Sequence, residues 1–269
     1  MNLKDRVAVI TGAGSGIGRA TALSLARRGC YLALADINAA GLAESQAQVL
    51  SAGARVSSHR LDVADREAVA ALPADILATH GRVDLLVNNA GVALGGNFEQ
   101  VSEADFDWLF EINFHGVVRM TRAFLPLLRA SDDACIVNIS SVFGLISPPG
   151  QSAYSASKFA VRGFSNALRL ELAGTRVAVS VVHPGGVATA IARNARVAQD
   201  VTAEEKRHRL ELAERMLRLP PEMAGEIIVR GVEKRRARIL VGRDAAIISL
   251  LERLLPVNYW RVLGARLRP

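Results

Sequence analysis

A tyrosine and a lysine lie four residues apart in the stretch AYSASKFAV, residues 153–161. In a helix this spacing puts Tyr154 and Lys158 on one face, a single turn apart. An unperturbed phenol titrates at about pH 10, and lowering its pKa to about 7 requires roughly 4 kcal/mol. An ammonium about 4 Å away supplies roughly that much at an effective dielectric of about 20. The pair could therefore exchange protons near neutral pH, although an ordinary pair on a helix surface has the same spacing.

The elements that must position this pair alternate between strand and helix. Short apolar, β-branched runs recur at intervals of roughly 25 to 45 residues with amphipathic stretches between them, which is typical of a parallel sheet covered on both faces. We expect seven strands, within residues 6–11, 31–36, 54–63, 83–91, 134–140, 175–183 and 238–242. The predicted fold class is α/β, with a doubly wound, Rossmann-type parallel sheet of seven strands and helices on both faces.

A glycine-rich turn follows the first predicted strand in VAVITGAGSGIGRATALSLARRG. Its glycines would let the backbone turn tightly and approach a pyrophosphate closely, while the helix starting near Gly16 would present free N–H groups to the anion. The spacing is TGxxxGxG rather than GxGxxG, and a glycine-rich turn can be a mere tight connection. The strand before it and the helix after it favour a dinucleotide site.

Asp36 ends the second predicted strand, 18 residues after Gly18. An acidic residue at this place would hold the adenosine ribose hydroxyls. A 2′-phosphate about 4 Å from the carboxylate would cost roughly 4 kcal/mol per unit charge. We therefore expect NAD rather than NADP, with Arg19 directed to the helix surface. The alternative for Asp36 is a role as a helix N-cap or turn residue.

Two further segments lie at the carboxyl ends of predicted strands, where ligands gather in open sheets. Asp62 and Val63 end the third strand, and NNAG, residues 88–91, ends the fourth. We expect both segments to contribute to the same nucleotide site as the glycine-rich turn.

Several motifs, in order along residues 5–189, resemble those of the short-chain dehydrogenase/reductase family in its single-domain form. TGAGSGIG resembles the family's glycine motif, NNAG its fourth-strand motif, INFHG its asparagine segment, NISS its serine strand, YSASK its YxxxK motif and PGGVAT its proline-glycine motif. Taken together, these motifs are highly specific.

The resemblance implies a catalytic tetrad of Asn113, Ser141, Tyr154 and Lys158. Ser141 is preferred to Ser140 because the family's serine lies 13 residues before its tyrosine. Tyr154 would exchange the proton as hydride moves, Ser141 would donate a hydrogen bond to the reacting oxygen, and Lys158 would lower the phenol's pKa and hold the nicotinamide ribose. Asn113 would support a water chain to Lys158.

The predicted cofactor is NAD, with NADP less favoured, and no metal is expected. The residues predicted to bind NAD are Gly12, Ser15, Gly16, Ile17, Gly18, Asp36, Asp62, Val63, Asn89, Ala90, Gly91, Tyr154, Lys158, Pro184, Gly185, Val187 and Thr189.

The segments expected beside the substrate are apolar, which indicates a hydrophobic alcohol, ketone or aldehyde. They supply Val142, Phe143, Leu145 and Val187. A helix within residues 202–219, opened by a capping box of Thr202 and Glu205, would cover them as a lid within an insertion at 187–219. His183 is tempting as an acid or base, but a structural histidine at a strand end is the favoured interpretation.

The activity that this site predicts is NAD-dependent hydride transfer between an alcohol and a carbonyl compound. A non-catalytic NAD-binding sensor or scaffold of the same fold is the alternative. The retained serine, tyrosine and lysine favour the enzyme, because a protein without the chemistry need not keep them.

The formal net charge is +7, and all of the excess lies in the last part of the chain. Residues 1–192 hold 16 basic and 16 acidic residues, whereas residues 193–269 hold 17 and 10. Nucleic-acid binding is not expected, because aromatic residues make up only 5% and no recognition motif is present.

We expect one domain over residues 1–242, followed by a basic amphipathic extension over 243–269. One face of the extension's helix would carry Ile247, Leu250, Leu251, Leu254 and Leu255. It could dock on its own core or on another subunit, in keeping with the homotetramer or homodimer that the resemblance implies. It could also make weak peripheral contact with anionic lipid, because an apolar face flanked by Arg and Trp suits a membrane interface.

The compartment expected for this chain is the cytoplasm. No stretch resembles a membrane span or a secretory signal. The two cysteines, Cys30 and Cys135, lie far apart in apolar segments and are expected to be reduced core residues.

Overall fold

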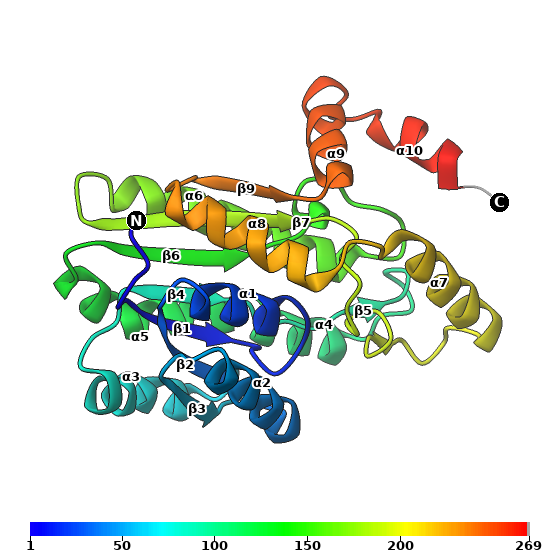
Figure 1. The fold of residues 1–269 in the computed structure, drawn as a ribbon. Helices are drawn as coiled ribbons and strands as arrows, with labels where there is room; N and C mark the ends of the chain where they lie inside the picture. The colour runs from blue at the N-terminus through cyan, green and yellow to red at the C-terminus, as the bar shows by residue number, and fades with distance from the viewer. Residues whose placement is uncertain (268–269) are drawn as a thin grey trace.

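Seven parallel strands form the central sheet of the computed structural model, which describes residues 1–267, apart from the side chains of residues 203, 209 and 265–267 (Figure 1). Their order across the sheet is β3-β2-β1-β4-β6-β7-β9. The strands are β1 (Val7–Thr11), β2 (Tyr31–Asp36), β3 (Val56–Arg60), β4 (Leu85–Asn88), β6 (Ala134–Ile139), β7 (Val177–Pro184) and β9 (Arg238–Val241). All seven predicted strands and the predicted fold class are therefore confirmed.

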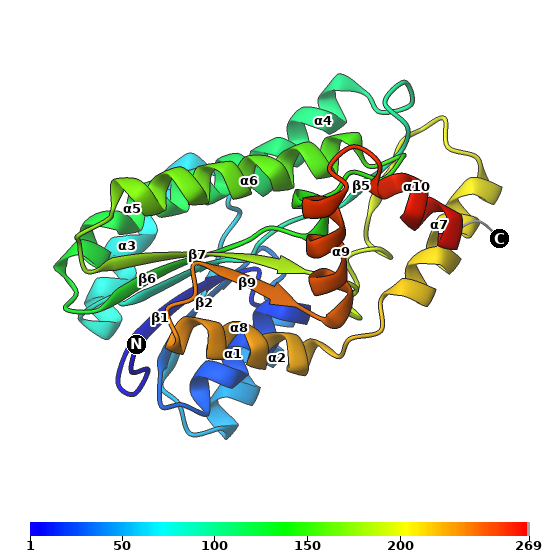
Figure 2. The same cartoon turned by 90° about the horizontal axis from the view of Figure 1, so that it is seen from above.

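Helices cover both faces of this sheet (Figures 1 and 2). Three helices share one hydrophobic core, namely α1 (Gly16–Ala26), α2 (Ala39–Ser51) and α8 (Pro221–Glu233). A second core lies on the other face, under α3 (Arg66–His80), α5 (Gly116–Ala130) and α6 (Ser152–Glu171). Because both faces are covered, all five residues of β1 are buried. This explains why the strand reads as a continuous apolar run.

The strand order reverses at β1, which pairs with β2 on one side and β4 on the other. Connections from the carboxyl ends of β1 and β4 therefore leave the sheet next to each other. In doubly wound sheets this point is where a ligand crevice forms. The predicted glycine-rich turn follows β1, so the topology places it at this crevice.

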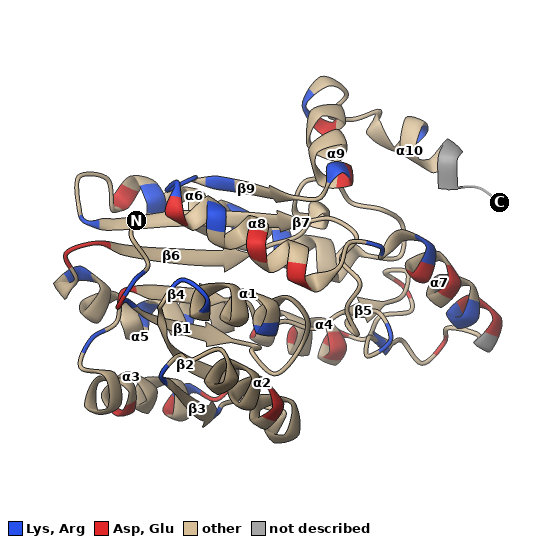
Figure 3. Ribbon diagram, viewed as in Figure 1, with Lys and Arg blue, Asp and Glu red and all other residues tan. Residues whose placement is uncertain are grey.

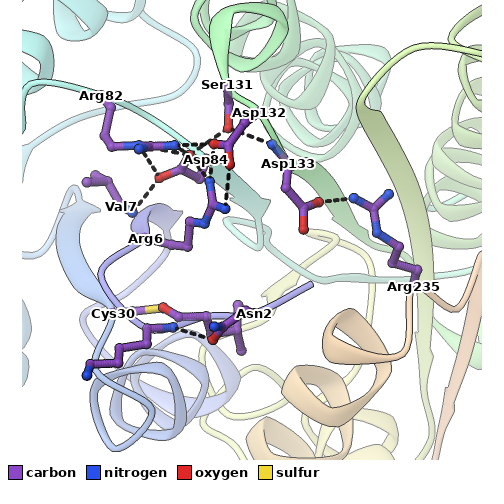
Figure 4. A network of polar contacts seen from close by, with 12 residues as sticks. Asn2, Arg6, Val7, Cys30, Arg82, Asp84, Ser131, Asp132, Asp133 and Arg235 are labelled. Atoms are coloured by element: carbon purple, nitrogen blue, oxygen red, sulfur yellow. Dashed lines mark hydrogen bonds and ion pairs between the residues drawn. The ribbon is translucent and has the colours of Figure 1, made fainter.

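A network of ionic contacts holds the opposite edge, where the strands begin (Figure 4). Asp84 is fully buried and accepts hydrogen bonds from the Val7 N–H at 2.9 Å, the Ser131 hydroxyl at 2.6 Å and Arg6 at 3.2 Å. Arg6 also pairs with Asp132. These contacts join the starts of β1, β4 and β6, and they satisfy a carboxylate that would otherwise be costly to bury.

Several short elements connect the sheet to its surroundings at the carboxyl edge. They are β5 (Leu94–Gly95), α4 (Glu103–Phe110), the π-helix η1 (Glu111–His115), the 3₁₀ turn η2 (Val142–Gly144), β8 (Arg196–Val197) and α7 (Ala203–Met216). The capping box of Thr202 and Glu205 opens α7 as predicted. Acidic and basic residues alternate with others along this helix (Figure 3).

The region 187–219 differs from the prediction in two ways. No strand was expected there, yet β8 pairs with β5 in a small parallel sheet, whose two-residue strands are too short to leave a periodic pattern. The helix also ends at Met216 rather than near residue 219. It stops because the N–H groups of Arg218 and Leu219 both donate to the Gly186 carbonyl at 2.9 Å.

The chain ends in two helices, α9 (Arg243–Leu254) and α10 (Tyr259–Leu267), which lie beyond the carboxyl ends of β7 and β9 (Figure 2). The predicted amphipathic helix is thus present, whereas residues 268–269 of the predicted extension lie outside the described residues. Its apolar face does not dock on the chain's own core: Ile247 is 59% exposed, Leu250 58% and Leu254 67%.

No helix within residues 1–267 is long and apolar enough to cross a membrane. Cys30 and Cys135 are both buried and free, as predicted.

Candidate active site

The glycine-rich turn forms a tight cradle between β1 and α1. Gly12 and Gly16 have positive φ angles of 64° and 53°, a conformation that favours glycine. A Cβ on Gly18 would lie 2.1 Å from the Gly12 carbonyl oxygen, so only glycine lets α1 approach the turn this closely. Ser15 is exposed in the turn, and Ile17 is half-buried on the first turn of α1.

Asn89 holds this cradle in place. Its side-chain amide donates to the backbone carbonyls of Thr11 and Gly12, each at 3.0 Å. The Thr11 hydroxyl in turn accepts from the N–H groups of Asn89 and Ala90, each at 3.1 Å. Asn89 was predicted as a cofactor-binding residue, and its side chain is bonded to the loop itself. The part played by Thr11 was not predicted, although it occupies the first position of the TGxxxGxG pattern.

The proline-glycine segment after β7 reaches the same cradle. A Cβ on Gly16 would lie 3.1 Å from the methyl carbon of Thr189. Pro184 ends β7, Gly185 donates to the Val241 carbonyl at 2.9 Å, and Val187 is 3% exposed. Two segments of the predicted cofactor site, far apart in sequence, thus enclose one space. A Cβ on Gly16 would crowd this space, whereas glycine leaves the N–H groups at the start of α1 open to approach by the pyrophosphate of a dinucleotide.

Asp36 lies at the edge of this cradle. Its two carboxylate oxygens accept from the N–H groups of Gly14 at 2.7 Å and Asn38 at 2.9 Å. The N-cap of α2 is Asn38, so Asp36 is not the cap itself. Each carboxylate oxygen has a further lone pair with which to accept from a ribose hydroxyl.

The expectation that Arg19 points to the helix surface is wrong. Its guanidinium turns back toward α2, where it donates to the Gly41 carbonyl at 3.1 Å and the Ser45 hydroxyl at 2.8 Å. It also pairs with Glu44 at 2.8 Å. The N–H groups of Arg19 are therefore bonded to acceptors in the turn and in α2, whereas those of a free surface arginine would bond to water.

The segments after β3 and β4 lie beside the cradle. Asp62 accepts from the Ala64 N–H at 2.9 Å, and Val63 is buried. A Cβ on Gly91 would lie 3.1 Å from the side-chain oxygen of Asn113 and 3.4 Å from Lys158 Nζ. The end of the NNAG motif therefore directly adjoins two members of the predicted tetrad.

Tyr154 and Lys158 lie on the first turns of α6 and face each other. Lys158 Nζ lies 5.6 Å from the centre of the Tyr154 ring and donates to the Ile139 carbonyl at 3.2 Å. The lysine is only 4% exposed. The ring of Phe143 meets the tyrosine ring edge to face, with 6.1 Å between the centres. The predicted pairing of phenol and ammonium is therefore present in the structure.

Burial shifts the pKa values of both groups. It raises the pKa of the Tyr154 phenol to about 12, with a hydrogen bond to Ser141 acting in the opposite direction. Burial also lowers the pKa of the Lys158 ammonium to about 8. The prediction that Lys158 brings the phenol's pKa near 7 is wrong for the polypeptide itself. Desolvation of the phenolate outweighs the effect of an ammonium that lies over the ring.

Asn113 lies in the π-helix η1, a distortion often found at functional sites. The residue is fully buried. Its amide donates to the Val92 carbonyl at 3.0 Å and to the Ser157 hydroxyl at 3.2 Å. Ser157 itself donates to the Tyr154 carbonyl at 2.7 Å, so it links Asn113 to the helix that carries the tyrosine. Ser157 was not predicted, although it is the polar residue directly before Lys158.

Ser141 follows β6 and caps the turn η2, where its hydroxyl oxygen accepts from the Phe143 N–H at 3.1 Å. The predicted substrate-facing residues are not equally accessible. Val142 is 8% exposed, Leu145 1% and Val187 3%, and Val187 packs in the core between the sheet and α1. Phe143 is half-buried and contacts the tyrosine, so it is the member of this set best placed beside a reacting group.

Known proteins resemble this chain along nearly its whole length. A family model described as short chain dehydrogenase matches residues 6–200. SadH of Mycobacterium tuberculosis, a protein that carries the name oxidoreductase, is 48% identical over 267 residues, which cover 98% of this chain and 96% of SadH.

Solved structures agree with this relationship. A short-chain dehydrogenase/reductase from Burkholderia phymatum in complex with NAD has a TM-score of 0.87 and 34% identity, covering 94% of this chain and 95% of that one. A metagenomic short-chain oxidoreductase in complex with NADP has a TM-score of 0.65 and 36% identity, covering 68% and 84%. The chain therefore belongs to the short-chain dehydrogenase/reductase family of oxidoreductases, whose cofactor is a nicotinamide dinucleotide.

Proposed function

We propose that this protein is an NAD-dependent oxidoreductase that interconverts an apolar alcohol and its carbonyl compound. The observation that carries the proposal is the convergence of Tyr154, Lys158, Ser141 and Asn113 beside the glycine-rich cradle. Lys158 Nζ lies over the phenol ring at 5.6 Å, and Gly91 adjoins both Lys158 and Asn113. Four side chains from three separate segments thus meet where a nicotinamide ring could be held.

Each member of the tetrad has a proposed task. A bound nicotinamide dinucleotide supplies the hydride acceptor or donor. Tyr154 gives its proton to the carbonyl oxygen during reduction and takes it back during oxidation, and Ser141 donates a hydrogen bond to the same oxygen. Lys158 provides a positive charge next to the phenol and holds the nicotinamide ribose. Asn113 fixes the start of α6 through Ser157, in addition to the water chain that the family resemblance implies.

The charge of the cradle supports a preference for NAD. Asp36 would face a 2′-phosphate with a carboxylate, and the next residue, Ile37, is apolar and 59% exposed. Arg19, which could have neutralised that phosphate, is bonded to the turn, to α2 and to Glu44. Structures similar to this chain hold either NAD or NADP, so Asp36 is the residue on which this preference rests.

The substrate class is proposed from the side chains around the phenol. Phe143 packs against Tyr154, and Val142, Leu145 and Ile146 line the turn behind it without a charged group among them. An apolar ketone, aldehyde or alcohol fits such surroundings better than a polyol. We assign α7 the role of a cover over this side of the site, because it lies beyond the carboxyl ends of the strands (Figure 1). The cytoplasm is the proposed compartment.

The test is an absorbance assay for NADH with purified protein over apolar cyclic and linear ketones, aldehydes, alcohols and polyols. For the best substrate, Tyr154→Phe should lower kcat by about 10³-fold or more, since the proton donor is lost. NADH binding, measured by fluorescence, should change by less than about threefold. Tyr31→Phe is the matched control, because that phenol lies on β2 and contacts Asp5 away from the site.

Two outcomes would contradict the proposal. A Tyr154→Phe variant with wild-type kcat would remove the phenol from the reaction. A wild-type protein that binds NADH tightly but oxidises or reduces none of these compounds would favour the sensor or scaffold alternative.

We also propose that the protein forms a homodimer or homotetramer, with weak contact to anionic lipid as the alternative use of α9 and α10. Both uses are supported by the exposed apolar face of α9 and by Val257, which is 85% exposed between the two helices. Arg253 and Arg261 flank this face and are exposed as well.

A further inference from the structure

His183 is a fully buried histidine at the end of β7, directly before Pro184. Its Nδ1 atom lies 2.9 Å from the backbone carbonyl oxygen of Ser141. Its Nε2 atom is buried and has no hydrogen-bond partner among the residues that the structure describes. A buried polar ring with one bonded and one unbonded nitrogen requires a physical account.

The partner of Nδ1 determines the state of the ring. A carbonyl oxygen can only accept a hydrogen bond, so Nδ1 carries the proton and Nε2 carries the lone pair. Burial lowers the pKa of His183 to about 4, opposed by the bond to Ser141 and assisted by the positive charges of Arg238 and Arg162. The ring is therefore neutral at neutral pH, in the tautomer that donates to Ser141.

An acid or base role for His183 does not fit this geometry. The nitrogen that carries the proton is bonded to the main chain, and the other nitrogen has no access to solvent or to a substrate. Proton exchange with a substrate requires a group within hydrogen-bond reach of it. Any effect of His183 on the reaction must then be exerted through Ser141.

The contact acts on the peptide unit that carries the Ser141 side chain. The Ser141 carbonyl accepts two hydrogen bonds, from His183 and from the Gly144 N–H at 2.9 Å. With the carbonyl fixed, the peptide plane that contains the Ser141 Cα atom is fixed as well, which limits the positions that the hydroxyl can take. That hydroxyl accepts from the Phe143 N–H at 3.1 Å and makes a hydrogen bond with Tyr154.

The residues next to Ser141 are held by hydrogen bonds that do not involve His183. Ser140 donates from its N–H to the Val182 carbonyl at 2.8 Å and from its hydroxyl to the Lys158 carbonyl at 2.8 Å. Arg162 donates to the Gly144 carbonyl at 3.2 Å. The contact from His183 is thus the link by which β7 reaches Ser141 itself.

We propose that His183 is a positioning residue whose Nδ1–H holds the Ser141 carbonyl so that the serine hydroxyl faces Tyr154. The inference rests on the proposed function, in which Ser141 binds the reacting oxygen. It adds a residue that contacts neither substrate nor cofactor and still sets the geometry of the reaction.

The experiment compares two substitutions of similar size. His183→Asn keeps an N–H donor at the place of Nδ1, whereas His183→Leu fills the space without a donor. We expect His183→Leu to lower kcat by about tenfold or more, because a small displacement of a catalytic hydroxyl is costly. NADH affinity should stay within about twofold of wild type. His183→Asn should recover kcat to within about threefold of wild type.

Ser180→Ala is the matched control for loss of a buried polar group on the same strand. Its hydroxyl donates to the Arg236 carbonyl at 2.9 Å, away from the site. This variant should keep wild-type kcat even if its thermal midpoint falls. Equal kcat in His183→Leu and wild type would overturn the proposal, as would equal losses in the Leu and Asn variants.

A second readout needs no turnover and separates this inference from the proposed function. Nitrogen NMR of the imidazole should show a protonated Nδ1 and an unprotonated Nε2 between pH 6 and 9, a range well above the pKa of about 4. In a crystal structure of His183→Leu, the Ser141 hydroxyl should turn away from Tyr154. The opposite tautomer or an unmoved hydroxyl would overturn the inference, whereas a wild-type protein without oxidoreductase activity would overturn the proposed function.

Discussion

The phenol of Tyr154 holds its proton more tightly in this protein than in water, because its burial disfavours the phenolate. Lys158 is buried too, and its ammonium gives up its proton more easily than usual. At neutral pH the site therefore contains a protonated phenol under a positive charge. This state suits donation of a proton to a carbonyl oxygen.

The pH dependence of reduction should follow Lys158. Because its pKa is about 8, the ammonium is charged below this pH and loses its charge above it, while Tyr154 stays protonated throughout. We expect kcat/KM for carbonyl reduction to decline as the pH rises through about 8. The measurement is the pH dependence of kcat/KM for the best substrate. Lys158→Met should abolish the decline near pH 8 along with most of the activity. A profile that rises through the same range would contradict the assignment.

Cofactor choice should follow Asp36. Asp36→Asn removes the charge but keeps the shape, so NADPH should bind at least about tenfold more tightly than to wild type. NADH should bind somewhat more weakly, because the ribose hydroxyls lose a charged acceptor. Fluorescence titration with both dinucleotides measures the ratio. Asp5→Asn, on the surface near the start of β1, is the control that should leave it unchanged, and wild-type protein that prefers NADPH would refute the argument.

At the scale of elements, the site depends on close approach between segments rather than on any one loop. The turn η2 packs on α6 so tightly that a Cβ on Gly144 would lie 2.8 Å from the Lys158 carbonyl oxygen. The first residues of α9 reach the same region, where Asp244 accepts from the Gly186 N–H at 2.6 Å. Tyr259 of α10 accepts from the Ser147 N–H at 3.0 Å. The terminal helices therefore hold both segments that flank the site.

The apolar face of α9 provides a test at this scale. Leu250 is 58% exposed and Leu254 67% exposed. If this face forms the subunit interface, the double variant Leu250→Gln, Leu254→Gln loses apolar contact there. We therefore expect light scattering to give a smaller mass for this variant than for wild type. Leu170→Gln is the control, because Leu170 is 66% exposed on α6. An unchanged mass together with lost sedimentation on phosphatidylglycerol vesicles at low salt would assign the face to lipid instead.

Across the whole molecule, the two edges of the sheet are specialised. The amino edge is closed by the buried carboxylate of Asp84 and its partners, whereas the carboxyl edge gathers the glycine-rich cradle, the tetrad and the terminal helices. Changes at the amino edge should alter unfolding and leave the cofactor site intact.

The pair of α1 and α8 should contribute stability that depends on pH. Hydrogen bonds from Arg28 and Ser24 lower the pKa of Glu226 to about 2. The contribution of Glu226 to the free energy of unfolding is therefore complete above its unfolded pKa of about 4.5 and is lost as the pH falls toward 2. Glu226→Gln should cost about 1 to 2 kcal/mol at pH 7, after allowance for solvent screening.

Urea unfolding at pH 7 and pH 3 measures this effect. The difference in free energy of unfolding between wild type and Glu226→Gln should be smaller at pH 3 than at pH 7, because part of the stabilisation by the Glu226 carboxylate is lost at pH 3. Glu222→Gln, an exposed carboxylate on the same helix, is the control. A difference that grows at low pH would contradict the assignment of the stabilising charge to Glu226.

Sequence reasoning reached the sheet and the pair of Tyr154 and Lys158 from local signals, whereas Asn113 and Ser141 followed only from the family resemblance. Apolar runs mark strands buried on both faces, and YSASK sets its two functional groups by helical spacing alone. The sequence did not predict β5 and β8, because a strand of two residues is too short to show a hydrophobic periodicity. It placed Arg19 wrongly because its acceptors lie on α2.

The pKa of Tyr154 was misjudged for a related reason. Pairwise attraction can be estimated from spacing, but desolvation depends on everything that surrounds the phenol. The exposed apolar face of α9 is a similar case. An amphipathic pattern indicates that one face of a helix is apolar, but it does not indicate what covers that face.

The contact between α1 and α8 also bears on how the chain is made. Arg28 meets Glu226, a residue synthesised 198 positions later, and Gly225 lies where a Cβ would approach the Ala20 backbone at 2.6 Å. While the polypeptide is still leaving the ribosome, the part of this face that α8 covers thus stays exposed until residues 221–233 have been made, although α1 and α2 can already cover the rest. Completion of this core must then wait for α8, and chaperones that shield apolar surface have that interval in which to act.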